Sequence, residues 1–273
     1  MSSFSERYEN IDWEQVRLNR YKEEKENPNN YSYWYPKVKD CGIPMVTSRI
    51  YQIPLHIWKS FMEMENKENR EQCAEWIFNT IVKDETVQEN VQYNIKNGCF
   101  SNKFNAEDCN VEYNKLVEGF LNIQYMSQCY DTGGTTELVV RDYLPFNNQI
   151  TPTIYNGLPL RPEFRVFVDF DTNEILYIVN YWDYDYCSKG IYDKTDKIVF
   201  DYMREELDRN YHKHANTVVQ LIRDKLLPYN TQQNNKLTGK WSVDIMLWGN
   251  SYFLIDMAIA HRSAYWDKNR RDY

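Results

Sequence analysis

Two aspartates near the end of the chain lie inside apolar segments, where an ionised carboxylate needs a partner. Asp244 lies within VDIML and Asp256 within LIDMAIA. Carboxylates rarely occupy the middle of such strands unless they are paired with a base or bind a cation. Magnesium prefers oxygen ligands and usually shares them with phosphates. The two aspartates are therefore candidate magnesium ligands, and ion pairing with a buried Arg or Lys is the alternative.

The register of one hairpin decides whether these aspartates can share a metal. Strands are predicted at 241–248 and 252–260, separated by Gly249 and Asn250. Residues directly opposite in an antiparallel pair point to the same face. A two-residue turn would pair Asp244 with Ile255, and the two acids would then point to opposite faces of the sheet. We therefore expect a bulge or a three-residue loop at 249–251. The expected core face carries Val243, Ile245, Leu247, Phe253, Ile255 and Met257.

A second hairpin is predicted from EFRVFVDF at 163–170 and ILYIVNYW at 175–182. Alternation in the first strand separates an apolar face from one that carries Glu163 and Arg165, with Arg161 just before the strand. Charges solvated at a sheet edge are the alternative for these residues. If the hairpin lines a cleft, we expect Arg165 and Glu163 to lie on the same side as the two aspartates.

Two further segments carry residues that could bind a nucleotide. Lys96 ends a predicted strand (91–96), and Lys103 lies beyond it in a loop with Gly98 and small polar residues, which could fold over phosphates. The strand ELVVRDYL (137–144) contains Arg141, Asp142 and Leu144. Its backbone could hydrogen-bond to an adenine edge if it connects two lobes.

The remaining pattern predicts a mixture of sheets and covering helices. Apolar residues at helical spacing predict one long helix over about 201–227. Segments rich in Pro and Gly interrupt the first half of the chain. We therefore expect an α+β or mixed α/β architecture. Further expected elements are a helix at 12–26, short extended pieces over 31–54, helices at 55–83 and 111–128, and a turn at 131–136.

Composition limits the classes of function. The chain has 273 residues, which suits one large or two small domains, and a net charge of −8. This charge argues against binding duplex nucleic acid, which requires a basic surface. No apolar run is long enough to span a membrane, and the polar N-terminus lacks the apolar core of a secretory signal. We expect a cytoplasmic location, with the six cysteines as free thiols.

Taken in order, these segments resemble the ATP-grasp superfamily over roughly 90–260. The segment EFRVFVD resembles a strand of its amino-acid-ligating enzymes, and VDIMLWGNSYFLIDMA resembles their metal-binding hairpin. LVVRDYLPF followed by EFRVFV is similar to the eukaryotic cell-division-cycle ATP-grasp proteins, and compact phage ATP-grasp proteins look similar as well. The resemblance implies two α+β lobes with ATP held between antiparallel sheets. The expected parts are a small N-terminal α/β region (1–85), the small lobe with its linker strand (86–145), and a C-terminal lobe (146–273).

The resemblance also implies a role for each residue. It implies that Mg²⁺ and ATP are bound, and that a carboxylate is activated as an acyl-phosphate for attack by an amine or thiol. The identities of the carboxylate and the nucleophile stay open, a peptide or protein included. The implied catalytic residues are Arg165, at the γ-phosphate, and Arg161. Residues implied to bind the nucleotide are Lys96, Lys103, Arg141, Asp142, Leu144 and Glu163, and the implied metal ligands are Asp244 and Asp256.

Two positions depart from the family pattern. Many members have Asn two residues after the second metal-binding acid, where this chain has Ala258, and Gly98 stands alone in the phosphate loop. An assembly factor that binds ATP without ligase turnover is therefore an alternative, and an interaction module with a decayed site is another. His261 and Ser263 do not indicate a hydrolase, and they are expected at the acceptor end of the cleft.

Overall fold

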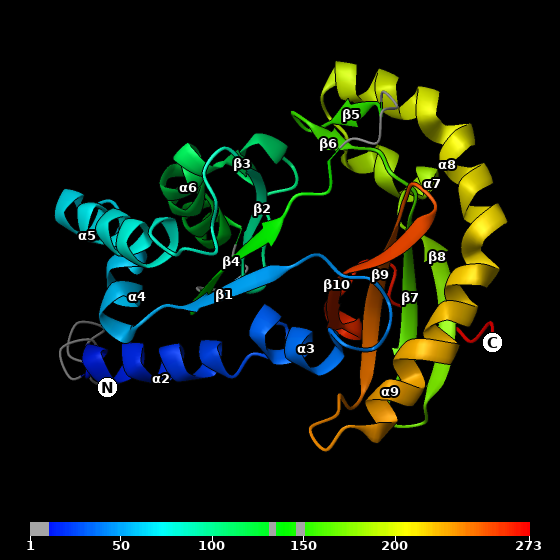
Figure 1. Ribbon diagram of the computed structural model, residues 1–273, viewed down its shortest axis with the longest axis horizontal. Coiled ribbons are helices and arrows are strands. Elements are labelled where there is room, and N and C mark those ends of the chain that lie inside the picture. Colours follow the sequence, from blue (N-terminus) through cyan, green and yellow to red (C-terminus); the bar gives the residue numbers. More distant parts are fainter. Residues whose placement is uncertain (1–10, 131–134, 146–150) are drawn as a thin grey trace, which may run out of the picture.

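Two antiparallel four-stranded sheets form the framework of the protein in the computed structural model, which describes residues 11–130, 135–145 and 151–273. The first sheet has the order β1-β4-β2-β3 and the second has the order β10-β9-β7-β8 (Figure 1). A short third sheet pairs β5 (Thr153–Ile154) with β6 (Leu158–Pro159). The strands of the first sheet are β1 (Ser48–Gln52), β2 (Gln92–Asn97), β3 (Asn110–Glu112) and β4 (Glu137–Asp142). Those of the second are β7 (Glu163–Asp169), β8 (Glu174–Asn180), β9 (Lys240–Trp248) and β10 (Ser251–Ile259).

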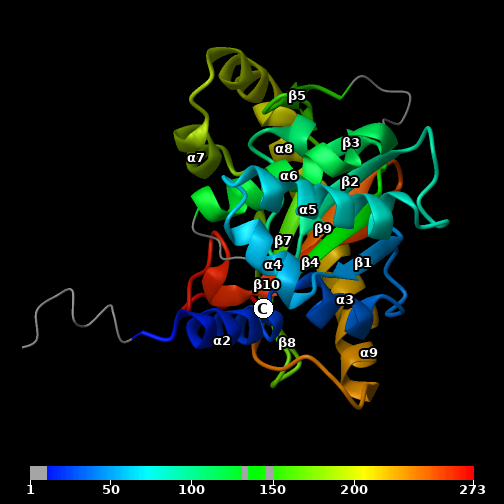
Figure 2. The same ribbon diagram turned by 90° about the vertical axis from the view of Figure 1, so that its left-hand side faces the viewer.

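Each large sheet packs one face against its own set of helices (Figures 1 and 2). Helices α4 (Leu55–Met62), α5 (Lys67–Ile77) and α6 (Leu116–Cys129) cover the first sheet. Helices α3, α8 and α9 cover the second. The two-lobed α+β architecture expected from the sequence is therefore confirmed. The other helices are α2 (Trp13–Lys25), α3 (Tyr31–Val38), α7 (Tyr184–Cys187), α8 (Lys194–Leu221) and α9 (Leu227–Gln232), with π-helical turns at Phe78–Val82 and Ile222–Leu226 and 3-10 turns at Ala106–Asp108, Tyr113–Lys115, Ser188–Gly190 and Ala260–Arg262.

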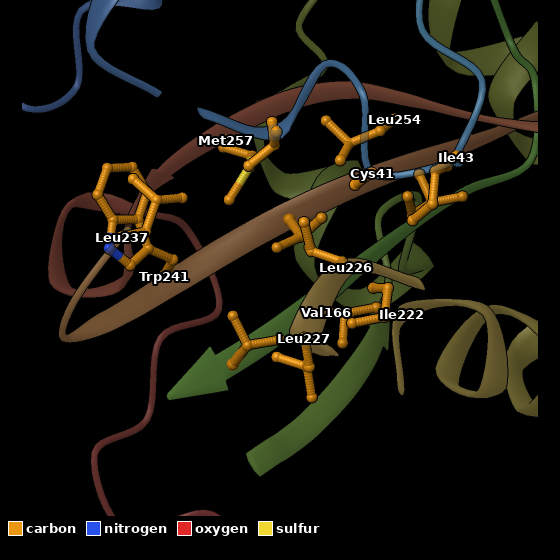
Figure 3. Packing of buried hydrophobic residues seen from close by; sticks show 14 of the residues in the cluster. Cys41, Ile43, Val166, Ile222, Leu226, Leu227, Leu237, Trp241, Leu254 and Met257 are labelled. Carbon is orange, nitrogen blue, oxygen red and sulfur yellow. The ribbon is translucent and has the colours of Figure 1, made fainter. Parts of the chain in front are cut away.

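Figure 3 shows the core between the second sheet and its helices. Val166 from β7, Trp241 from β9 and Leu254 from β10 meet Ile222 and Leu226 from the turn that follows α8. The predicted apolar face of 163–170 lies in this core, which leaves the opposite face of β7 free to line a cleft.

Three predicted elements differ from the structure. Residues 31–38 were expected to be extended but form α3, because Tyr31, Trp34 and Val38 recur at helical spacing and are all buried. The predicted helix at 111–128 begins at Leu116, because the residues before it pair with β2 as β3. The long helix begins at Lys194, where the side chain of Asp193 caps it. The turn predicted at 131–136 lies largely outside the described residues.

The final hairpin reaches the predicted register in an unexpected way. Its turn is the tight two-residue Gly249-Asn250, with Trp248 paired to Ser251, so the expected bulge or longer loop at 249–251 is wrong. A bulge at Ile255, farther along β10, shifts the pairing by one residue. Beyond the bulge, Asp256 lies opposite Asp244.

The bulge also corrects the predicted core face. Phe253 and Ile255 were expected to be core residues, but both are half-exposed, and Phe253 packs against Trp248. Leu254 is fully buried instead, and Met257 beyond the bulge is core as predicted. A single extra residue reverses the alternation on one side of the bulge and preserves it on the other.

Core truncation tests this register. We expect Leu254→Ala to lower the free energy of unfolding by about 2–5 kcal/mol, since it empties a fully buried site. Phe253→Ala, which removes a larger but half-exposed side chain, should cost clearly less. Denaturant unfolding of both variants measures the difference. A larger loss for Phe253→Ala would contradict the bulge.

Two other features bear on the expectations from composition. None of the six cysteines forms a disulfide, and all six lie in the described residues. Within the described ranges, every helix is either too short or too polar to cross a lipid bilayer.

Candidate functional site

Three charged residues lie in one row across adjacent strands of the second sheet. Arg165 on β7 is opposite Asp244 on β9, which is in turn opposite Asp256 on β10. Arg165 binds the Asp244 carboxylate with two parallel hydrogen bonds, from Nε at 2.8 Å and from Nη2 at 2.7 Å. Both side chains are nearly buried. Such a bidentate pair holds both groups in a fixed orientation.

The first sheet supplies a lysine to the other end of this row. Lys96 on β2 is 2% exposed, and its Nζ lies 3.1 Å from both oxygens of Asp256. Asp256 is 40% exposed, so the pair opens toward solvent on the aspartate side. Residues separated by 160 positions in the sequence are therefore joined across the gap between the two sheets.

Arg141 makes a second bridge between the sheets. From β4 it donates Nη1 to the carbonyl of Ile255 at 2.8 Å, and it donates Nε to Oδ1 of Asn94 on β2 at 3.0 Å. Ile255 is the bulge residue, whose carbonyl has left the regular ladder. The bulge therefore sets the register of the acids and also provides an acceptor for the opposite lobe.

A cavity of about 170 Å³ lies where these groups meet. It brings together eight of the ten residues predicted for the site, and the other two, Lys96 and Arg165, bind the aspartates at its edge. The eight lining residues are Lys103, Arg141, Asp142, Leu144, Arg161, Glu163, Asp244 and Asp256.

Ion pairing shifts the pKa values of Asp256 and Arg165 toward their charged forms. Burial alone would raise the pKa of Asp256, but Lys96 and Arg141 lower it below its usual value. Burial likewise works against the charge on Arg165, but Asp244 raises its pKa. The site therefore carries two ion pairs, each with its cation and its anion on different strands.

Glu163 has no such partner. Burial, followed by the negative charge of Asp244, raises its pKa to about 7 from a usual value of 4.5. The opposing effects of Lys103 and Arg165 are smaller. Among the described residues no cation lies within ion-pairing distance of its carboxylate. A carboxyl group in this cleft whose pKa lies near 7 can gain or lose its proton when a ligand binds.

The raised pKa of Glu163 gives a testable pH dependence. Between about pH 4.5 and 7 the unfolded chain loses this proton while the folded protein retains it, so stability falls as the pH rises. We expect the free energy of unfolding of Glu163→Gln to fall by about 1–3 kcal/mol less than that of the parent over this pH range. The free energy of unfolding at pH 5 and pH 8 should be measured for both proteins. An unchanged difference between the two pH values would show that Glu163 titrates normally.

Tyr181 is a cleft residue that the sequence did not reveal. It follows β8 and lines the cavity. The Lys103 ammonium hydrogen-bonds to its hydroxyl and lies 4.8 Å from the ring centroid, and the Arg165 guanidinium lies 4.8 Å from the same centroid. Tyr181 therefore holds one cation from each lobe. Nothing in the local sequence distinguishes it among 23 tyrosines.

The residues predicted to lie near adenine form hydrogen bonds with two arginines of the protein. The Asp142 carboxylate accepts a hydrogen bond from Arg49 at 2.8 Å. The Leu144 carbonyl accepts one from Arg161 at 2.9 Å, and burial lowers the pKa of Arg161. Arg161 thus orders the chain just after β4, at the mouth of the cavity.

The acids fit a magnesium ion that arrives with phosphates. Asp244, Asp256 and Glu163 offer oxygen ligands around one cavity. Within the described ranges, no three acidic, histidine or cysteine side chains converge closely enough to hold a metal alone. Magnesium commonly uses one or two carboxylates and completes its shell with phosphate oxygens and water. At the position where the family pattern has Asn, Ala258 lies opposite Ser242, whose hydroxyl donates to the Ala258 carbonyl at 3.3 Å.

Comparisons with known proteins return similar folds only among solved structures. C-terminally truncated Cdc123 from Schizosaccharomyces pombe is 12% identical over 84% of this chain and 82% of its own, with a TM-score of 0.45. A RimK domain ATP-grasp protein from Sphaerobacter thermophilus is 12% identical over 84% of this chain and 57% of its own, with a TM-score of 0.37. No protein-family model and no curated protein sequence matches the chain.

A third structure was determined with a nucleotide. D-alanine–D-alanine ligase from Bacillus anthracis, complexed with ATP, is 10% identical over 84% of this chain and 52% of its own, with a TM-score of 0.39. The chain spans about half the length of that ligase. These matches concern the fold alone.

Proposed function

We propose that this chain binds Mg-ATP in the cleft between its two sheets and uses it to activate a carboxylate for attack by an amine or a thiol. The observation that carries the proposal is the pair of cross-strand ion pairs, Lys96–Asp256 and Arg165–Asp244, at the edge of one cavity. Each pair combines a group that binds phosphate with a group that binds magnesium.

Nucleotide binding in this proposal exchanges the partners of both pairs. Lys96 would turn to the α- and β-phosphates and Arg165 to the γ-phosphate. Each transfer leaves an aspartate without its cation, which is most costly at Asp244, because that carboxylate is buried. Magnesium, when bound, would neutralise both aspartates together with the β- and γ-phosphates. Nucleotide and metal should therefore bind cooperatively.

The remaining cleft residues would position the reactants. Tyr181 holds Lys103 and Arg165 beside each other, so both cations can meet the transferred phosphoryl group. A carboxylate oxygen of the acceptor would attack the γ-phosphorus, the bond to the β–γ bridging oxygen would break, and ADP would leave. An amine or thiol would then attack the acyl carbon, lose its proton and release phosphate. Arg165 would stabilise the charge that develops during the first step.

Turnover is the experiment that tests this function. The protein with Mg-ATP should release ADP faster when a suitable carboxylate and nucleophile are added from a panel of amino acids and peptides. Phosphate should form in equal amount, and mass spectrometry should identify the joined product. ATP binding without any stimulated ADP release would overturn the ligase proposal.

The second candidate is an assembly factor that binds ATP without ligase turnover. Ala258 favours it, because this position lacks the additional metal ligand of the family pattern. The two functions share the nucleotide site and differ in turnover. Saturable Mg-ATP binding with no acceptor that stimulates ADP release is the result expected for this candidate.

A further inference from the structure

The C-terminal segment of the chain, residues 263–272, lies across the cleft-facing side of the second sheet. It starts at β9, where the Ser263 hydroxyl lies 2.6 Å from that of Ser242. It passes β7, where the Ala264 carbonyl accepts a hydrogen bond from Arg165 Nη1 at 3.3 Å. It ends beside β8, where the Asp272 amide donates a hydrogen bond to the Leu176 carbonyl. The segment therefore touches the same guanidinium that binds Asp244.

The sheet holds this segment mainly through its main-chain atoms. The Tyr177 hydroxyl donates to the Tyr265 carbonyl at 3.1 Å and accepts from the Asp267 amide at 2.6 Å. The Leu176 carbonyl accepts from the Asp272 amide at 2.8 Å. Main-chain groups are common to all polypeptides, so another peptide that adopts the same turns could make the same hydrogen bonds.

Side chains of the segment add further contacts, among them the Arg270 guanidinium, which lies 4.9 Å from the Tyr177 ring centroid. The Trp266 ring lies 5.4 Å from that of Phe167 and stacks 6.3 Å from that of Tyr177. The Tyr265 hydroxyl donates to the Tyr181 carbonyl at 2.8 Å. This surface therefore has a place for an aromatic anchor directly beside the cleft.

The segment adopts a strained conformation where it crosses the site. Tyr265 has a φ of 67°, in the left-handed region that a bulky residue rarely occupies. Such a conformation costs conformational free energy. This cost reduces the net stability of the bound segment and makes its displacement by a better-fitting chain easier.

We propose that the surface covered by residues 263–272 is the acceptor site, and that this segment occupies it in place of a polypeptide substrate. The Ala264 carbonyl oxygen stands where a carboxylate oxygen of the substrate would meet Arg165. The inference rests on the proposed function, because Arg165 must bring that carboxylate to the γ-phosphate. While the segment is bound, the acceptor is excluded, and a polypeptide must displace the segment before the carboxylate can react.

Peptide binding to the full chain tests the inference. The probe is a fluorescent peptide with the sequence of residues 261–273, HRSAYWDKNRRDY. It should bind the double variant Tyr265→Ala/Trp266→Ala at least tenfold more tightly than the parent, because the intramolecular competitor is weakened. The control variant Tyr192→Ala/Tyr202→Ala removes two exposed aromatic residues elsewhere and should bind like the parent.

Hydrogen exchange on the parent protein provides a measurement that needs no variant. Millimolar peptide should accelerate exchange of the Asp267 and Asp272 amides, since displacement of the segment breaks their hydrogen bonds. Equal peptide binding by parent and double variant, with unchanged exchange, would overturn the acceptor site if Mg-ATP still binds. Absence of Mg-ATP binding in the parent would overturn the proposed function as well.

Discussion

Replacing Arg165 with methionine is expected to weaken ATP binding by about ten- to hundredfold and ADP binding much less. The lost contact is to the γ-phosphate, which ADP lacks, and a charged hydrogen bond of this kind contributes about 1.5–3 kcal/mol. Calorimetric titration of each nucleotide with magnesium present gives the two ratios. Equal losses for ATP and ADP would show that Arg165 does not meet the γ-phosphate.

Lys96→Met is the companion variant, and it should weaken ATP and ADP alike because both carry the α- and β-phosphates. Two control variants remove a lysine and an arginine that lie outside the cavity. Lys240→Met removes a lysine that also pairs with an aspartate on the second sheet, 3.7 Å from Asp169, but does not line the cavity. Arg204→Met removes an arginine stacked on Tyr184, 4.2 Å from its ring centroid and outside the cavity. Both controls should bind nucleotide like the parent.

Replacing either cleft aspartate with asparagine should remove most of the magnesium dependence of ATP binding. Asp244→Asn and Asp256→Asn each delete an anionic ligand while keeping the size of the side chain. ATP without magnesium should bind these variants at least as well as it binds the parent. In the variants, Lys96 or Arg165 can turn to the phosphates without leaving a charged carboxylate unpaired. With magnesium, the parent should bind at least tenfold more tightly than either variant.

Stability must be measured for the same aspartate variants. Arg165 is 11% exposed, and Asp244→Asn leaves it with a neutral partner, so some loss of folding free energy is expected. Asp169→Asn, on the same sheet but outside the cavity, serves as the control and should keep normal magnesium dependence. If both cleft variants bind Mg-ATP like the parent, the metal role is wrong.

Much of strand β7 could be predicted from the sequence because its apolar residues alternate with charged ones. The face of β7 that carries Glu163 and Arg165 follows from the apolar residues between them. Helix α3 was missed because its four aromatic residues and Pro36 favour an extended chain, whereas burial of Trp34 in the core stabilises a helix. Tertiary packing overrides local preference in such short segments.

The register of the β9–β10 hairpin could be predicted only in part from the sequence. Gly249 and Asn250 correctly indicate a two-residue turn, and the pairing of Asp244 with Asp256 was also expected. The two-residue turn and the pairing of the two aspartates are compatible only because of the bulge at Ile255. No residue type near Ile255 indicates a bulge there. The bulge carbonyl is bound by Arg141, so its location depends on the other lobe.

The sequence did not show which cation pairs with which aspartate in the site. The sequence identified Lys96, Arg165 and both aspartates, and it left open whether buried bases pair with these acids. It could not show that Lys96 pairs with Asp256 while Arg165 pairs with Asp244. Contacts between residues so far apart in the chain depend on how the two sheets are placed, which local patterns do not encode.

Calorimetric titration of the parent protein with ATP, first with excess magnesium and then with a chelator, tests whether nucleotide and metal bind the cleft together. The two ion pairs predict at least tenfold tighter ATP binding with magnesium, because only the metal compensates the aspartates that Lys96 and Arg165 leave. Magnesium alone should bind far more weakly than it does with ATP, since both acids are already paired. Equal ATP affinity with and without magnesium, or no ATP binding at all, would contradict the exchange of partners on which the account depends.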